Sequence, residues 1–582
     1  MEFRALHVII ACTVFFTNKS IQVNAENDQR APVVKTESGA VVGKIETVPH
    51  SKAVYQYLGI PYAEPPVGEL RFAAPKPAKP WSKIMDATEF GAICQQNRLL
   101  LDILKVVGAK MSEDCLSLNV FVPSNIKPSE KIAVMVWIHG GGFVAGSSGF
   151  TPGAVLASFN DVIVVSINYR LGVFGFFNVP GTDLKGNYGM LDQVLAFKWV
   201  KNNIASFGGD PNRVTIFGES AGGMSVSLHL LSPLSKGLFE RAILQSGASS
   251  TPLFCGKVSN TAQLELFAKY IKCDLGQDFV QCVRGKSVED ILTTQKLFTL
   301  DNFDRRRTQD FVAPVVDGKF LPDLPETLFR AGEFQKGIDV ITGLTSNEGG
   351  VFAMIRPPSQ FKDGLEKDVF EHIVRSQTLY HREKSEIMED LILFQYTNHT
   401  IPQDKNAIRQ SMLEIWGDSA FDAPAMLEAQ SLAKSGGSTY MYVFNHRANY
   451  SRMADWTSVI HGAEIPFLFG APFKKIPDPW SNSIATKYSE TEKGLSLYVM
   501  ELWTNFAKHG SPNPPDVGPT AITWPVFTEE EQKYLVLDMK PRVERRYKAK
   551  KMAFWNQMIP KLAKIVTDER KDANEKVPKD EL

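Results

Sequence analysis

The stretch IFGESAGG, residues 216–223, places a serine between glycines two positions to either side. VTIF at 214–217 is typical of a short buried strand, and the following AGGMSVSLHLL carries small and then apolar residues at helical spacing. Ser220 is therefore predicted on a tight turn between a strand and a helix. A Cβ at Gly218 or Gly222 would collide with neighbouring backbone there.

This pattern is that of a nucleophile elbow, G-x-S-x-G, which lifts a serine hydroxyl clear of a sheet. So short a motif also occurs by chance in unrelated chains. A passive serine on a glycine-rich turn is the alternative, and the rest of the chain has to decide between the two.

Alternating elements around the elbow indicate the fold class. IAVMVWIH (132–139) and VIVVSINY (162–169) are almost continuously apolar, as strands covered on both faces should be. Residues 187–207 then favour a helix, and RAILQS (241–246) favours a further strand. This rhythm predicts an α/β fold with a large, mostly parallel central sheet and helices on both faces. The apolar stripe expected on the helix is Leu191, Val194, Leu195, Trp199 and Val200.

Length and charge limit the possibilities further. A chain of 582 residues suggests about four domains at roughly 150 residues each. No Gly/Ser or Pro linker separates the irregular helical regions at 255–335 and 355–440 from the rest, so we expect one domain over 26–578 with helical insertions. Lys+Arg and Asp+Glu balance at 64 each, which gives no indication of a nucleic-acid partner.

Both ends of the chain carry targeting signals. Residues 1–25 combine one Arg, an apolar run of about a dozen residues and a VNA cleavage site, which predicts a cleaved signal peptide because the run is too short for a membrane span. No later stretch is long and apolar enough to span a membrane. The last four residues, 579–582, read KDEL, an address read by the KDEL receptor. We therefore expect the protein in the lumen of the endoplasmic reticulum.

In an oxidising lumen, the cysteines that remain after signal removal can form disulfides. Cys94 with Cys115, and Cys273 with Cys282, are reasonable disulfides, and the first would contribute about 3 kcal/mol by restricting the unfolded chain. Cys255 is left over, and we favour a buried free thiol over a redox role. Two sequons, at Asn398 and Asn449, are candidate glycosylation sites.

A serine nucleophile also needs donors for the oxyanion that it creates. WIHGGGF (137–143) follows a predicted strand and carries three consecutive glycines, the pattern of an HGGG-type oxyanion loop. The N–H groups of Gly141, Gly142 and Ala221 would bind the tetrahedral intermediate. Loss of one such donor typically costs about 3 kcal/mol.

Several motifs occur together and in order along nearly the whole chain. HGGGF, NYRLGVFGF, GNYGMLDQ, FGGDP and GESAGG resemble the type-B carboxylesterase family, the cholinesterase-like branch of the α/β hydrolases. YLGIPYAEPPVGELRF, SEDCLSLNV and WTNFAKHGSPNP extend the resemblance to both ends. It implies an α/β-hydrolase fold, a serine carboxylesterase activity without metal or cofactor, and the two disulfides paired as above. It fits an endoplasmic-reticulum-retained carboxylesterase, with an insect-type member as one alternative.

The resemblance also assigns the remaining catalytic residues. The family's acid matches Glu348 in GLTSNEGG and its base matches His461 in HGAEIPFLFG, in the chain order Ser, Glu, His. Of the other histidines, His139 is expected to support the oxyanion loop and His509 to end a helix. One departure is Ser458, three residues before the base, where the family often has glycine.

The expected substrate is a small, uncharged carboxylic ester. In cholinesterases the loop closed by the first disulfide supplies a tryptophan for the quaternary ammonium, but 95–114 here lacks Trp, Tyr and Phe and is rich in leucine. Glu219, where juvenile hormone esterases commonly have glutamine, favours a general carboxylesterase. A specialised hormone or pheromone esterase, a lipase and a non-catalytic cholinesterase-like binding protein remain as alternatives. Glu219 and Ser246 match family motif positions and are expected to support the site.

Overall fold

The computed structural model describes residues 30–97, 110–251, 261–300, 313–354, 361–376, 385–449, 451, 453–476, 488–514 and 522–566. The predicted signal peptide, the terminal KDEL, Cys255 and the leucines at 99–106 lie outside these ranges. Within them, every helix is too short or too polar to cross a lipid bilayer.

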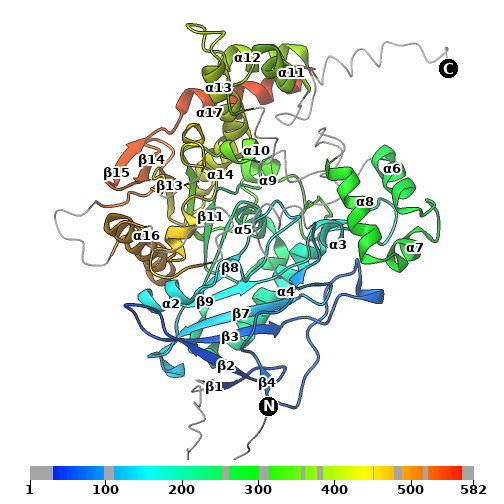
Figure 1. The fold of residues 1–582 in the computed structure, drawn as a ribbon, viewed down its shortest axis with the longest axis vertical. Coiled ribbons are helices and arrows are strands. Elements are labelled where there is room, and N and C mark those ends of the chain that lie inside the picture. The colour runs from blue at the N-terminus through cyan, green and yellow to red at the C-terminus, as the bar shows by residue number, and fades with distance from the viewer. Residues whose placement is uncertain are drawn as a thin grey trace, which may run out of the picture.

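A thirteen-stranded sheet forms the centre of the molecule (Figure 1). Pairing is parallel from β9 through β14 and antiparallel at the flanks, apart from the short β4. The mostly parallel sheet predicted from the sequence is confirmed. Its order is β1 (Arg30–Lys35), β2 (Ala40–Glu46), β3 (Val54–Pro61), β7 (Ser117–Pro123), β9 (Ile163–Ile167), β8 (Ile132–Ile138), β10 (Gly209–Glu219), β11 (Arg241–Gln245), β12 (Asp339–Thr345), β13 (Thr439–Phe444), β14 (Lys533–Leu537) and β15 (Arg542–Arg545), with β4 (Met85–Asp86) beside β2.

Helices cover both faces of this sheet because alternate side chains of its strands are apolar on both sides. On β8, Val134 and Val136 pack into one core with α4 (Tyr188–Asn203), α5 (Ala221–Leu231) and α14 (Ala423–Leu432). Met135 and Trp137 pack into a second core on the other face, with α2 (Ala154–Asn160) and α16 (Glu490–His509). The predicted two-sided covering is therefore confirmed.

The apolar stripe predicted for α4 is wrong in detail. Leu191 and Leu195 are only partly buried, whereas Met190, Ala196 and Phe197 are buried against the sheet. The helix is enclosed on more than one side, and it also buries Asp192 and Gln193, so its contact surface is wider than one stripe.

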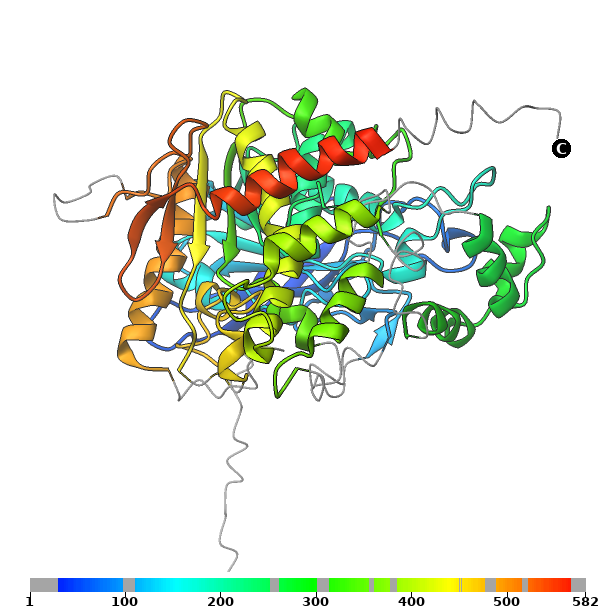
Figure 2. The same ribbon diagram turned by 90° about the horizontal axis from the view of Figure 1, so that it is seen from above.

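Two groups of helices extend from the sheet (Figures 1 and 2). In Figure 1, α6 to α8 form a group at the right-hand side of the molecule, and α11 to α13 lie at its top. Figure 2 shows the C-terminal helix, in red, lying along the helices of 405–432. The other elements are α3 (Gly172–Phe176), α6 (Thr261–Ile271), α7 (Phe279–Gly285), α8 (Val288–Leu300), α9 (Pro325–Ala331), α10 (Gly350–Met354), α11 (Lys367–Ser376), α12 (Glu386–Tyr396), α13 (Lys405–Gly417), α15 (Ile465–Leu468) and α17 (Ala549–Ala553), with the short pair β5 (Ile93–Cys94) and β6 (Met111–Ser112).

Candidate active site

Ser220 lies on the turn between β10 and α5, as the sequence predicts. Its backbone has φ 59° and ψ −124°, a combination that L-residues rarely adopt. Its N–H donates to the carbonyl of Gln245 at 2.9 Å, which ties the turn to β11. A Cβ at Gly218 would come within 2.6 Å of the backbone of Gly222, and one at Gly222 would collide with the Ile138 carbonyl. The glycines are therefore required by close backbone approach.

The glycine loop after β8 lies directly beside this serine. A Cβ added to Gly140 would lie 3.0 Å from the Cβ of Ser220. Gly141 and Gly142 have φ angles of 112° and 63°, which favour glycine. Within the described residues their N–H groups donate no backbone hydrogen bond, and the N–H of Ala221 is at the first position of α5, where no intrahelical acceptor exists. Three N–H groups without a backbone acceptor among the described residues thus lie in the two segments that meet at Ser220.

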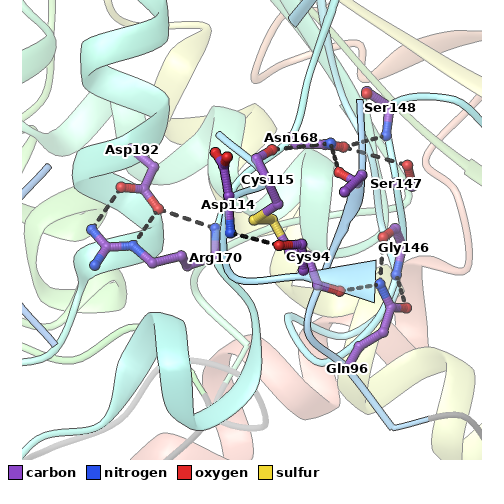
Figure 3. Close-up of a disulfide and its surroundings, with 12 residues drawn as sticks. Cys94, Gln96, Asp114, Cys115, Gly146, Ser147, Ser148, Asn168, Arg170 and Asp192 are labelled. Atoms are coloured by element: carbon purple, nitrogen blue, oxygen red, sulfur yellow. Dashed lines mark hydrogen bonds and ion pairs between the residues drawn. A yellow bond between two sulfur atoms is a disulfide. The ribbon is translucent and has the colours of Figure 1, made fainter. Parts of the chain in front are cut away.

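The first disulfide holds the segment that follows these glycines (Figure 3). Cys94 and Cys115 are bonded, with their Cα atoms 5.0 Å apart. Next to this bond, the side chain of Gln96 both donates to the carbonyl of Gly146 and accepts from its N–H, each at 2.9 Å. The disulfide loop therefore holds the segment after the predicted oxyanion glycines at Gly146.

Asn168 and Arg170, both in the NYRLGVFGF motif, complete this support (Figure 3). The Asn168 amide donates to the Cys115 carbonyl at 3.2 Å and accepts from the Ser148 N–H at 2.9 Å. Arg170 forms a buried bidentate pair with Asp192 of α4, at 2.7 and 2.8 Å. In the sequence this motif served only as part of the family resemblance. In the structure its Asn168 and Arg170 join the loop after β9 to the disulfide segment and to α4.

Glu348 lies in the turn after β12 with its carboxylate fully surrounded. Its Oε1 accepts from the Ser246 hydroxyl and from the Thr345 N–H, both at 2.6 Å. Its Oε2 lies 2.5 Å from Nδ1 of His461. The expected supporting role of Ser246 is therefore visible as a direct hydrogen bond to this acid.

His461 is 3% exposed and lies between two carboxylates. Its Nε2 is 3.1 Å from Oε1 of Glu219, on the side opposite to Glu348. Burial opposes the charged imidazolium, but Glu219 and Glu348 outweigh it and raise the pKa of His461 to about 9. Burial also raises the pKa of Glu219 to about 8.

Sequence reasoning expected Glu219 to support the site, but it did not predict the contact of Glu219 with His461. The Ser220 hydroxyl has no hydrogen-bond partner among the described residues, and Nε2 faces the neighbouring carboxylate instead. Catalytic hydrogen bonds are often long before substrate binds, so this arrangement is compatible with a Ser–His pair. The position of Glu219, immediately before the elbow serine, was the available signal.

The turn before His461 is unusual at Ser458. This residue has φ 52° and ψ −132°, close to the backbone conformation of Ser220. Asn347, next to the acid, donates from its side chain to the Thr457 carbonyl at 2.6 Å and from its N–H to the Val459 carbonyl at 3.0 Å. The acid turn and the base turn are thus joined on both sides of Ser458.

Comparison with known proteins places this geometry in a family. The carboxylesterase family model matches residues 30–555. The chain is 36% identical over 547 residues to the rat pyrethroid hydrolase Ces2e, covering 92% of this chain and 91% of the rat protein. It is also 36% identical to the rat acylcarnitine hydrolase, covering 92% of each, and to the mouse acylcarnitine hydrolase, covering 93% of each.

The chain belongs to the carboxylesterase family. This carboxylesterase is accordingly an α/β hydrolase that cleaves carboxylic esters, and the alternative of a non-catalytic binding protein is not supported by relatives that are named as hydrolases. These relatives are mammalian, so the insect-type alternative stays a prediction.

Four further expectations can be placed in the carboxylesterase structure. Cys273 and Cys282 form the second predicted disulfide. His139 is buried and stacks on Tyr169 with ring centroids 4.5 Å apart, in keeping with a supporting role. His509 is the last residue of α16. The sequon residues Asn398 and Asn449 are both exposed, and their glycosylation stays a prediction.

Proposed function

We propose that Ser220, His461 and Glu348 form the catalytic triad of this carboxylesterase. The observation that carries the proposal is the 2.5 Å contact between His461 Nδ1 and Glu348 Oε2 behind a serine on a strained elbow. Glu348 fixes the imidazole tautomer with Nδ1 protonated, which leaves Nε2 as the base.

The reaction then follows in two halves. The Ser220 hydroxyl attacks the ester carbonyl while His461 Nε2 takes its proton, and the N–H groups of Gly141, Gly142 and Ala221 stabilise the oxyanion. His461 returns the proton to the leaving alcohol, and an acyl-enzyme on Ser220 remains. Water, deprotonated by the same histidine, releases the acid. In the first step Nε2 must exchange its contact with Glu219 for one with the serine.

Covalent labelling tests the nucleophile directly. An organophosphonate that loses its leaving group to an activated serine should attach to Ser220, and peptide mapping by mass spectrometry locates it. An adduct on another residue, with Ser220 unmodified in fully inhibited enzyme, would contradict the assignment.

The proposed substrates are uncharged esters with xenobiotic or lipophilic groups. The relatives' names support two chemistries, because pyrethroids are uncharged and acylcarnitines carry a quaternary ammonium. The loop 95–114 offers no aromatic side chain to receive such a cation, whose burial without a partner is costly, whereas a neutral alkyl group gains about 0.8 kcal/mol per buried CH₂.

A matched substrate series decides between these chemistries. An uncharged butyrate ester of similar size should exceed butyrylcholine in kcat/KM by more than tenfold, and butyrylcarnitine should resemble butyrylcholine. A higher value for either cationic ester would overturn the proposed substrate class, while leaving the triad intact.

We further propose retention in the endoplasmic reticulum lumen through the terminal KDEL. The signal-like residues 1–25 and the final tetrapeptide support this together. Deletion of 579–582 should send active enzyme into the medium, and the intact chain should stay in the cell. Equal secretion of both forms would refute recognition of the tetrapeptide.

A further inference from the structure

The helical stretch 417–422 lies beside both the acid and the base of the proposed triad. Between α13 and α14 the helix widens into a π-helical turn, η8 (Asp418–Asp422). Where α13 ends, a Cβ added to Gly417 would lie 3.6 Å from the Cβ of Glu348. At the other end of the turn, the ring of Phe421 lies 4.5 Å from the imidazole of His461. Such turns occur frequently at functional sites.

The turn carries two fully buried carboxylates. Both bind the same lysine, which comes from the C-terminal part of the chain. Asp418 and Asp422 are 0% and 1% exposed. The Lys548 ammonium lies 2.7 Å from Oδ1 of Asp418 and 2.5 Å from Oδ2 of Asp422. Lys548 precedes α17, far from the turn in sequence. The cation therefore connects the C-terminal helix to the turn that holds Phe421.

Because the two carboxylates are buried against Lys548, the charges of Asp418, Asp422 and Lys548 depend on one another. Burial raises the pKa of Asp422 to about 8, and the neighbouring Asp418 adds to this. Although burial opposes its charge, Asp422 and Asp418 hold the pKa of Lys548 well above its usual range. Without the Lys548 ammonium, the two carboxylates of this turn would face each other in the interior, with the Lys551 ammonium 3.8 Å from Oδ2 of Asp418 and a carboxylate of Asp422 that has lost its cation. The repulsion would be relieved when one carboxylate takes up a proton or moves.

We propose that Lys548 is a positioning residue for His461, acting through Asp418 and Asp422 on the Phe421 ring. The role rests on the proposed function of His461 as the base. By holding the π-helical turn in one shape, Lys548 keeps Phe421 against the imidazole, so that Nε2 stays aligned for the Ser220 hydroxyl. Small misplacements of catalytic groups reduce turnover strongly.

The test compares Lys548→Met with Lys548→Arg and with Lys550→Met in the full chain. Lys550 lies on α17, its side chain is exposed and it has no ion pair within the described residues, so it is a control on the same helix that lies outside the carboxylate cluster. With an uncharged butyrate ester, Lys548→Met should lower kcat by about tenfold and leave KM within about twofold. Lys548→Arg should restore most of the turnover, and Lys550→Met should not change it.

Full turnover in Lys548→Met, or an equal loss in Lys550→Met at the same thermal stability, would overturn the proposal. If Lys548→Met does not fold, Phe421→Leu reports on the same contact, and unchanged kcat in that variant would also overturn it. Ser220→Ala distinguishes a failure of the proposed triad from a failure of the proposed positioning role. A Ser220→Ala enzyme that retains activity refutes the triad itself, whereas an inactive one beside a fully active Lys548→Met refutes only the positioning role.

Discussion

Ser220 and Ser458 adopt nearly the same strained backbone conformation, and comparing them separates function from geometry. Their φ and ψ angles are 59° and −124°, and 52° and −132°. Conformations of this kind cost about 1–3 kcal/mol and persist only where the surroundings enforce them. At Ser220 the strain presents the hydroxyl of the proposed nucleophile. Ser458 is exposed, and its hydroxyl has no hydrogen bond within the described residues, so its strain serves only the path of the chain.

The surroundings explain why both conformations persist. Ser220 is held by β11 and by the start of α5, and Ser458 is held between the two hydrogen bonds that Asn347 makes to its neighbours. The lesson is that a strained residue beside a catalytic group is not by itself catalytic. The side chain must also reach the reacting atoms, and four experiments test this distinction.

The largest effect is expected at the elbow. Ser220→Ala and Ser220→Gly should each reduce ester hydrolysis by about 10³-fold or more, because the nucleophile is lost. Ser220→Gly should be at least as stable as the native enzyme, since glycine relieves the positive φ. Steady-state kinetics and thermal melts measure both quantities. Near-native turnover in a clean preparation of either variant would contradict the mechanism.

The next effect concerns the carboxylate that Ser220 has beside it and Ser458 lacks. Glu219 raises the pKa of His461, and a histidine base works only when neutral, so the acid limb of kcat/KM reflects that pKa. Glu219→Gln removes the negative charge, the imidazolium becomes less favourable, and the acid limb should move to lower pH.

A surface variant, Glu89→Gln, serves as the control for this pH profile because Glu89 is exposed and, among the described residues, forms an ion pair with Lys44 alone. Its acid limb should coincide with that of the native enzyme. An unmoved limb in Glu219→Gln would show that the carboxylate does not act on the base.

Ser458→Val tests whether the second strained turn matters through its backbone. A β-branched residue tolerates positive φ poorly, so the variant should lose about 2 kcal/mol of stability and show lower kcat as the His461 turn shifts. Ser458→Ala keeps the Cβ without branching and should behave like the native enzyme in both respects. Equal behaviour of Val and Ala would indicate that the turn adapts freely.

The smallest effect is a gain. Ser458→Gly should raise the free energy of unfolding by about 1 kcal/mol, because relief of the positive φ exceeds the entropy cost of glycine in the unfolded chain. Chemical denaturation measures the gain, and kcat should remain unchanged. A loss of stability would mean that Ser458 is not strained in solution.

Local motifs predicted the parts of the site whose geometry is set within a few residues. The turn at Ser220 and the positive φ angles at Gly141 and Gly142 each lie in a short stretch with its own steric signature. The disulfide between Cys94 and Cys115 was predicted instead from the oxidising compartment and from the family resemblance. The parallel sheet could be predicted because several of its strands are short, almost continuously apolar runs in the sequence.

Contacts between distant segments could not be predicted in this way. The meeting of Glu219 with His461, and that of Lys548 with the π-helical turn, depend on how separate helices and strands pack. No periodicity marks which buried carboxylate faces which cation. The error in the α4 stripe has a similar cause, because a helix enclosed by several neighbours carries no single polar face.

The order of strands in the sheet has a consequence for how the enzyme is made. From β11 to β15 each strand lies beside the one that precedes it in the chain (Figure 1). A chain emerging from the ribosome can therefore add these strands one at a time to an existing edge. Ser220 is in place early, Glu348 and His461 follow, and Lys548 arrives last. We expect nascent chains that end before Lys548 to carry a formed sheet and the three residues of the proposed triad without the lysine that positions His461, so that full turnover is reached only when synthesis is nearly finished.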